Sequence, residues 1–352
     1  MSILHLIRPD LLQNKQDAPK ADGSLHRLHA NELPWTAVSL DSIHFNVYPD
    51  TQAQRCLKEQ LAASYQVNEN QIVLTRGSDD AIDLVTRLFL KAGFDAFMQF
   101  PPTFSMYEFY IRLQQAQMIE CPLDMSNNFT LSIDKIQRYW QANCKIIMLC
   151  RPNNPTAHLI DLELIASVCK HYTNQSVIVV DEAYIEFSNA QSATTLIPQF
   201  ENLVVLRTLS KAYGLAGLRL GSIIAQSHLI EAFKSIIAPY SISSAVIELA
   251  RRALIQEDWF TSAVARIQKA RSELISALEL CPVIEKIYPT QANFILIKTS
   301  YAQELTACFA AQSIAIRDFP PTSVLHQHLR ITVGNNLQNQ ILMATLSSFS
   351  QP

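Results

Sequence analysis

The chain has 352 residues, of which 49% are hydrophobic and 17% charged, and its formal net charge is −3. This length favours about two domains with a sizeable apolar core, and no block of Lys or Arg points to nucleic acid or an anionic membrane as a partner. The seven cysteines are odd in number and form no CxxC pair, which argues against a disulfide framework or a zinc site and indicates reduced thiols in a cytoplasmic protein.

The first segment, residues 1–47, contains prolines and polar side chains with little periodicity. This pattern predicts an extended arm that packs on a small domain or on a partner subunit. The apolar stretch before Arg8 is short for a signal peptide. No apolar run further along the chain is long enough to span a bilayer.

The next segment, residues 48–238, alternates short β-branched runs with amphipathic stretches. Strands are predicted over residues 71–75, 96–100, 145–150, 176–181, 203–209 and 222–226. Helices are predicted over residues 52–65, 82–90 and 162–172. Such alternation is typical of a largely parallel sheet covered by helices on both faces.

The last segment, residues 239–352, has a different order of predicted helices and strands. One long helical region is predicted over residues 243–279, and shorter helices over 302–312 and 336–347. Two candidate strands, 292–298 and 328–334, lie between them. We therefore expect a smaller α/β domain at the C-terminus.

The central motif is RTLSKAYGLAGLRLG, residues 207–221, which directly follows a predicted strand. The ends of parallel strands are where ligands bind. Lys211, with its charge disfavoured by burial and by neighbouring cations, suits a nucleophilic amine, and Ser210 and Arg219 suit a phosphate. An isolated Ser-Lys pair would more simply be a loop lysine in an exposed ion pair, but the spacing of glycines and arginine favours the site.

A second motif, residues 176–187, ends an apolar strand at a carboxylate, Asp181. A carboxylate in that place needs a partner, and a protonated pyridine nitrogen is a suitable one. Tyr184, three residues on, is placed to bond a ring hydroxyl. The alternative is an aspartate that caps the next helix.

Two further strand ends carry polar turns. RPNNPTA, residues 151–157, offers the Asn154 amide as a donor to a phenolate oxygen, although a plain turn is the alternative. TRGSDDA, residues 75–81, begins a helix at Gly77 and Ser78, whose free N–H groups suit a phosphate. An ordinary serine cap is the alternative there.

Three other side chains complete the candidate set. Phe104 follows a stiff Pro-Pro turn and is able to stack on a flat ring, with core packing as the alternative. Arg330 alternates with the apolar residues of its predicted strand and so projects from the opposite face, where it is able to bind an anionic substrate group. Arg317 is a second candidate, and an exposed strand arginine is the alternative for each.

The motifs NNPT, DEAYIEF, RTLSKAYGLAGLRLG and LRITVG occur in this order, supported by TRGSDDAI and YPD, and the similarity extends from LHANELPW, residues 28–35, to LRITVG, residues 329–334. In this combination the chain resembles the fold-type I pyridoxal phosphate enzymes and, among them, the histidinol-phosphate aminotransferases. The resemblance implies an α/β fold with a large domain, residues 48–238, built on a mostly parallel seven-stranded sheet sandwiched by helices. A smaller C-terminal domain, residues 239–352, and the arm complete it.

The resemblance also implies roles for individual residues. Lys211 is the catalytic residue and holds pyridoxal 5′-phosphate as a Schiff base, and no metal is implied. The cofactor-binding residues are Ser78, Asp79, Phe104, Asn154, Asp181, Tyr184, Ser210, Lys211, Arg219 and, from the neighbouring subunit of a homodimer, Tyr48. The substrate-binding residues are Arg330, Arg317 and Asn31.

The implied reaction is a ping-pong transamination in histidine biosynthesis. L-Histidinol phosphate and 2-oxoglutarate give imidazole-acetol phosphate and L-glutamate. The chain departs from the family pattern at Phe104 (usually Tyr), Ala157 (usually Gly) and Asp80 (usually Glu), and no Tyr precedes Asn31. An aromatic-amino-acid aminotransferase is the nearest alternative, a threonine-phosphate decarboxylase is another, and a non-catalytic regulator is disfavoured because no basic patch accompanies the motifs.

Overall fold

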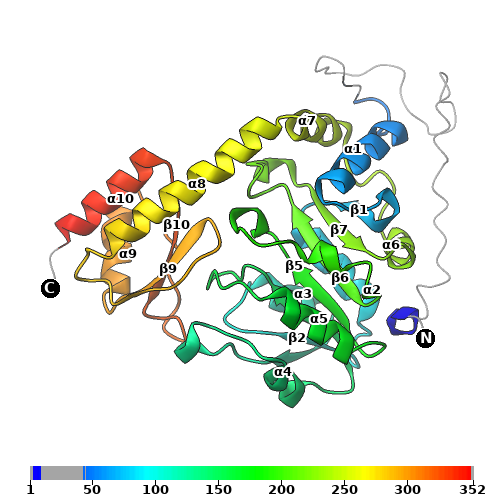
Figure 1. The fold of residues 1–352 in the computed structure, drawn as a ribbon, viewed down its shortest axis with the longest axis horizontal. Coiled ribbons are helices and arrows are strands. Elements are labelled where there is room, and N and C mark those ends of the chain that lie inside the picture. Colours follow the sequence, from blue (N-terminus) through cyan, green and yellow to red (C-terminus); the bar gives the residue numbers. More distant parts are fainter. Residues whose placement is uncertain (1–2, 9–42, 44, 350–352) are drawn as a thin grey trace.

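The computed structural model describes residues 3–8, 43 and 45–349 (Figure 1). Two sheets lie side by side in it, joined by a long helix that runs from one towards the other. The arm predicted over residues 1–47, and Asn31 with it, lies mostly outside the described residues.

The large sheet has seven strands in the order β1-β7-β6-β5-β4-β2-β3. Strand β7 pairs antiparallel with β1 and β6, and every other neighbouring pair is parallel. The mostly parallel seven-stranded sheet is therefore confirmed. Its strands are β1 (Ile72–Thr75), β2 (Ala96–Gln99), β3 (Gln117–Glu120), β4 (Cys144–Cys150), β5 (Val177–Asp181), β6 (Leu203–Thr208) and β7 (Gly221–Ala225).

Helices cover both faces of this sheet, which is why its central strands are largely apolar. In β5, Val177 and Val179 pack into one buried cluster, whereas Ile178 and Val180 pack into the other. A strand buried on both faces has no solvent-facing side to carry polar residues. The covering helices are α1 (Thr51–Ser64), α4 (Ile133–Tyr139) and α5 (Leu162–His171) on one face, and α2 (Ser78–Phe89), α3 (Met106–Leu113) and α6 (Ser227–Lys234) on the other.

The small sheet is antiparallel, in the order β10-β9-β8. Its strands are β8 (Lys286–Ile287), β9 (Phe294–Lys298) and β10 (His328–Thr332). Helices α9 (Ala302–Ala311) and α10 (Asn336–Ser348) pack on it with α8 (Glu257–Leu278), around a third buried cluster. Among the described helices, none combines the length and the apolar character that crossing a membrane requires.

The long helical region predicted over residues 243–279 is two helices, and this is a correction to the prediction. Helix α7 (Ser244–Leu254) ends before α8 begins, and Gln256 between them leaves the helical conformation with ψ of 56°. Glu257 and Asp258 then occupy the first turn of α8, where acidic side chains favour a helix start. Periodicity alone runs through this break because both helices are amphipathic.

Several short elements were not predicted from the pattern. Strand β3 lies at the edge of the large sheet and buries only Ile119, so it shows no apolar run. Strand β8 has two residues and helix α4 has seven. Elements this short leave too little periodicity to detect.

Candidate active site

The loops that carry the sequence motifs gather at one edge of the large sheet. Strands β2, β4, β5 and β6 run parallel, and β1 shares their direction because it is antiparallel to β7, which is antiparallel to β6. Their carboxyl ends therefore open at the same edge, the usual place for a ligand in such a sheet. The five motifs follow these five strands.

A cavity of about 520 Å³ opens at this edge, between the large sheet and the small one. It brings together side chains that are far apart in the sequence. Six of the predicted site residues line it: Phe104, Asn154, Tyr184, Lys211, Arg317 and Arg330.

The amine of Lys211 lies 5.4 Å from the centre of the Tyr184 ring. Burial lowers its pKa below the ordinary value, and the charges of Arg330 and Arg219 lower it further, although Asp79 and Asp181 oppose them. A lowered pKa leaves more of the amine neutral, which is the form that acts as a nucleophile or a base.

Asp181 is buried beneath the cavity, with 3% of its surface exposed. Its Oδ2 accepts a hydrogen bond from the Tyr107 hydroxyl at 2.7 Å, and its Oδ1 accepts one from the Ala183 N–H at 3.1 Å. Burial raises the pKa of this carboxyl to about 6. Because both hydrogen-bond donors are neutral, a cationic ring nitrogen is the kind of partner that would stabilise the charged form.

A cradle for an anion lies at the start of α2. Gly77 has φ of +86°, and helix α2 begins with the next residue, Ser78. A Cβ on Gly221 would lie 2.7 Å from the carbonyl carbon of Gly77 and 2.9 Å from the Ser78 nitrogen, so the turn requires glycine at that contact. A Cβ on Gly77 would lie 2.8 Å from Nη2 of Arg219, which pairs with Asp79 at 3.2 Å.

These contacts place the free N–H groups at the start of α2 beside the Arg219 guanidinium. Such a set of donors fits a phosphate. Ser210, on the loop after β6, adds a hydroxyl, 2.9 Å from the Thr208 hydroxyl. The residues present therefore fit the phosphate of the cofactor that the resemblance implies.

The two arginines from the small sheet are backbone neighbours. The Arg317 N–H donates to the Arg330 carbonyl at 3.2 Å, and the Arg330 N–H donates to the Arg317 carbonyl at 2.8 Å. The Arg330 guanidinium also donates to Oδ1 of Asn154 at 2.5 Å and lies over the Phe294 ring. Two guanidinium groups facing one cavity suit a substrate with a phosphate or carboxylate.

Tyr48 is described but does not line this cavity. It stacks on Tyr240 of the same chain, with ring centres 4.5 Å apart, and is 47% exposed. Asn31, predicted to contact the substrate, lies outside the described residues.

Two of the departures from the family pattern have local structural consequences. Ala157, where the family has glycine, adopts a left-handed φ of 58°, a conformation that costs a residue with a Cβ about 1–2 kcal/mol. Asp80 accepts a hydrogen bond from the Arg76 N–H at 2.8 Å and pairs with its guanidinium at 2.8 Å. This acidic residue therefore stabilises the turn before α2.

A buried charge network beneath the motifs was not predicted. Arg151 pairs with Glu182 at 2.8 Å, Arg207 pairs with Glu186 at 2.9 Å, and Arg207 lies 3.7 Å from Glu182. These residues connect the carboxyl ends of β4, β5 and β6. The signal in the sequence was a charged residue beside each apolar strand end, since such a charge is retained only where it is paired.

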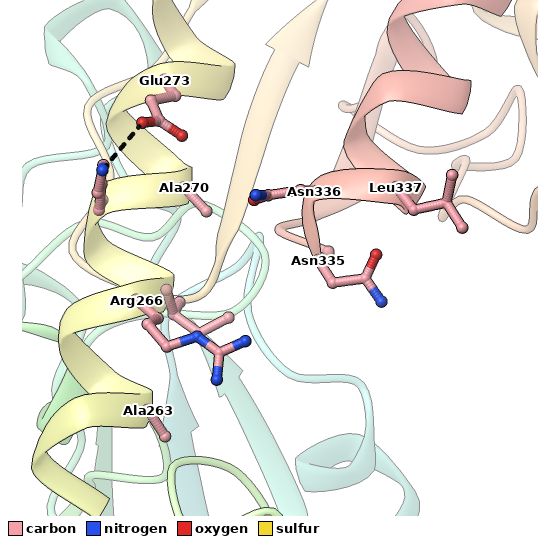
Figure 2. A pocket seen from close by; sticks show the side chains of 10 residues that line it. Ala263, Arg266, Ala270, Glu273, Asn335, Asn336 and Leu337 are labelled. Carbon is pink, nitrogen blue, oxygen red and sulfur yellow. Dashed lines mark ion pairs between the residues drawn. The ribbon is translucent and has the colours of Figure 1, made fainter.

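A second hollow, of about 590 Å³, lies between α8 and the start of α10 (Figure 2). Its charged residues, Arg266, Lys269 and Glu273, are exposed on α8, and Lys269 pairs with Glu273 at 3.8 Å. None of the predicted site residues lines it. The cavity at the strand ends is therefore the candidate active site.

Comparisons with known proteins agree with this geometry. The family model described as aminotransferase class I and II matches residues 22–346. The chain is 60% identical to histidinol-phosphate aminotransferase 1 of Legionella pneumophila subsp. pneumophila (strain Philadelphia 1), over 99% of this chain and 96% of that one. It is 36% identical to the histidinol-phosphate aminotransferase of Francisella philomiragia, over 98% and 95%.

Among solved structures, the histidinol-phosphate aminotransferase of Sinorhizobium meliloti in complex with pyridoxal-5′-phosphate has a TM-score of 0.76 at 21% identity. The alignment covers 86% of this chain and 84% of that one. At this identity the likeness shows a shared fold.

Proposed function

The chain belongs to the class I and II aminotransferases, and from this premise we infer that it is a pyridoxal phosphate-dependent histidinol-phosphate aminotransferase. It transfers the amino group of L-histidinol phosphate to 2-oxoglutarate and forms imidazole-acetol phosphate and L-glutamate. Identity of 60% to a histidinol-phosphate aminotransferase over nearly the whole chain supports this substrate. The observation that carries the chemistry is Lys211, an amine of lowered pKa in a cavity that also holds two arginines.

Bound pyridoxal phosphate supplies an electron sink that makes the proton on the substrate Cα labile. In our proposal the start of α2, at Ser78 and Asp79, binds the phosphate through backbone N–H groups, with Ser210 and Arg219 beside them. This assignment rests on the close contact of Arg219 with the Gly77 turn.

The ring is assigned to a second group of residues. Asp181 faces the ring nitrogen, because a buried carboxylate with neutral donors is stabilised by a cation. Asn154 and Tyr184 face the ring hydroxyl, and Phe104 packs on the ring face. Asn154, Tyr184 and Phe104 line the cavity together with Lys211.

Lys211 moves the proton. With the cofactor bound, Nζ of Lys211 would hold it covalently until the substrate amine takes its place. The freed Nζ would then be the base that removes the proton from the substrate Cα and the acid that returns that proton to the cofactor. The lowered pKa of Lys211 favours the neutral amine that the first of these tasks needs.

Arg330 and Arg317 bind the anionic end of each substrate in turn. Their guanidinium groups belong to neighbouring backbone segments on the side of the cavity formed by the small sheet. The same pair accepts the phosphate of histidinol phosphate and a carboxylate of 2-oxoglutarate. Arg330 donates to Oδ1 of Asn154, which leaves the Nδ2 amide group of Asn154 as the donor for the ring hydroxyl oxygen.

We further propose a cytoplasmic homodimer in which Tyr48 of one subunit completes the neighbour's site and Asn31 contacts the substrate. Support comes from large apolar side chains exposed near α7 and the start of α8, namely Leu249, Ile255 and Trp259. Such a group of exposed apolar residues is typical of a protein–protein interface. We also propose the division into an arm (1–47), a large domain (48–238) and a small domain (239–352), with the two sheets in separate domains.

The test is a single-turnover experiment on the cofactor-loaded protein. The visible spectrum of the bound cofactor is followed after addition of histidinol phosphate and, separately, of phenylalanine. Rapid conversion by histidinol phosphate alone is the expected result. Comparable conversion by phenylalanine would instead indicate an aromatic-amino-acid aminotransferase.

A further inference from the structure

Tyr107 is a fully buried tyrosine in the first turn of α3. Its ring is nearly perpendicular to the ring of Phe104, with centres 5.5 Å apart, and its centre lies 6.4 Å from that of the Phe97 ring. These apolar contacts leave the ring little freedom to turn. The position of its hydroxyl is therefore set by the packing of α3 against the sheet.

That hydroxyl donates to Oδ2 of Asp181 at 2.7 Å, across 74 residues of sequence. We propose that Tyr107 is a positioning residue whose hydroxyl orients the Asp181 carboxylate and favours its charged form for the ring nitrogen of the cofactor. The proposal rests on the assignment of Asp181 made above. Neither the sequence motifs nor the family resemblance assigns a role to Tyr107.

The charges around Asp181 show why such a donor matters. Burial raises the pKa of this carboxyl, and the hydrogen bond from Tyr107 is the largest effect that lowers it again. The Ala183 N–H and the charge of Lys211 act in the same direction, whereas Asp79 raises the pKa. Without the hydroxyl, the carboxyl would become protonated nearer to neutral pH, and a neutral acid pairs poorly with a cationic ring.

Tyr107 itself remains a donor throughout the working range of pH. Burial raises its pKa well above the ordinary value, and the nearby groups Asp181 and Cys150 raise it further. Tyr184, the other phenol close to Asp181, also has a raised pKa because it is buried. Neither phenol ionises at neutral pH, so the carboxylate receives a proton donor and not a competing negative charge.

The experiment measures binding of pyridoxal phosphate to the cofactor-free protein by equilibrium dialysis from about pH 5 to about pH 9. Tyr107→Phe keeps the ring and removes the hydroxyl. We expect it to weaken binding about tenfold near pH 7, since hydrogen bonds to charged groups are among the strong ones. As pH is lowered, the affinity falls when Asp181 becomes protonated. We also expect this fall to begin at a higher pH in Tyr107→Phe.

Tyr172→Phe is the matched control. Tyr172 is equally buried, its hydroxyl has no hydrogen-bond partner among the described residues, and it packs against Trp140 on the other face of the sheet. Tyr172→Phe should leave both the affinity for pyridoxal phosphate and the pH dependence of that affinity unchanged. A loss that is equal at every pH in Tyr107→Phe would show looser packing alone and would overturn the proposal.

Two more variants make the result decisive. In an Asp181→Asn background, removal of the Tyr107 hydroxyl should no longer shift the pH dependence. If Asp181→Asn by itself left the affinity unchanged, the assignment of Asp181 would fall and this proposal with it. Because no amino substrate is present, these outcomes are independent of the histidinol phosphate assignment.

A fluorinated tyrosine at position 107 covers the case in which Tyr107→Phe does not fold. Fluorine makes the phenol a stronger donor at nearly constant volume, so the pH dependence should move downwards. An upward shift, or none, would overturn the proposal.

Discussion

Replacement of Asp181 by asparagine should stabilise the cofactor-free protein at neutral and alkaline pH. The same replacement should lower the affinity of the protein for the cofactor. Asparagine has the same shape and does not ionise. Its amide satisfies the same two partners, because Oδ1 accepts from the Ala183 N–H and Nδ2 donates to the Tyr107 oxygen. The variant therefore removes the cost of a buried charge and little else.

The magnitude follows from the pKa of Asp181. Burial raises it from the ordinary 3.8 to about 6, so the folded state binds more protons than the unfolded state between these two values. Stability is then lost as pH rises through this window, by about 3 kcal/mol in total. We expect the advantage of Asp181→Asn over the natural protein to grow by about that amount between roughly pH 4 and pH 8.

The assay is urea unfolding of the cofactor-free protein at a series of pH values. Asp134→Asn is the control, because Asp134 is an exposed aspartate at the start of α4. The difference in unfolding free energy between Asp134→Asn and the natural protein should show no comparable change with pH. A constant difference between Asp181→Asn and the natural protein across this range would refute the reasoning that burial sets the charge state of Asp181.

Four other predictions can be checked directly. Lys211→Ala should remove the visible absorbance of the bound cofactor without unfolding the protein, and borohydride trapping of the cofactor on another lysine would contradict the assignment. Arg330→Ala should raise the KM for both histidinol phosphate and glutamate in steady-state assays, whereas an effect on glutamate alone would argue against a shared arginine. Glu182→Gln should lower the free energy of unfolding by about 3–5 kcal/mol in urea titrations, because the buried Arg151 loses its charged partner. Burial lowers the pKa of His328 to about 4. The folded state therefore resists protonation of this side chain, and its stability is lost as pH falls from about 6.5 towards 4. His328→Gln should flatten this part of the curve of unfolding free energy against pH.

The gathering of the candidate site residues could be predicted to a large extent, because these residues are close in sequence to strand ends. Lys211, Asp181 and Asn154 each follow an apolar run that reads as a strand. The topology of parallel strands then brings such residues to one edge. Their side chains do gather there around one cavity or directly beneath it.

Contacts between distant segments could not be predicted in this way. The bond from Tyr107 to Asp181 spans 74 residues, and the bond from Arg330 to Asn154 spans 176. The local sequence pattern gave Tyr107 no role. Its hydroxyl becomes significant because α3 packs beside the end of β5.

The sequence by itself therefore determined the alternation of strands and helices, the strand ends that carry the candidate site, and the residue types that suit a phosphate and a protonated ring. The tertiary structure decided the order of the strands, the break between α7 and α8, the pairing of Arg151, Glu182, Arg207 and Glu186, and the burial that shifts the pKa values of Lys211 and Asp181. The physical reason is range: backbone preference and amphipathic periodicity act over a few residues, whereas burial and charge pairing depend on which segments meet in space.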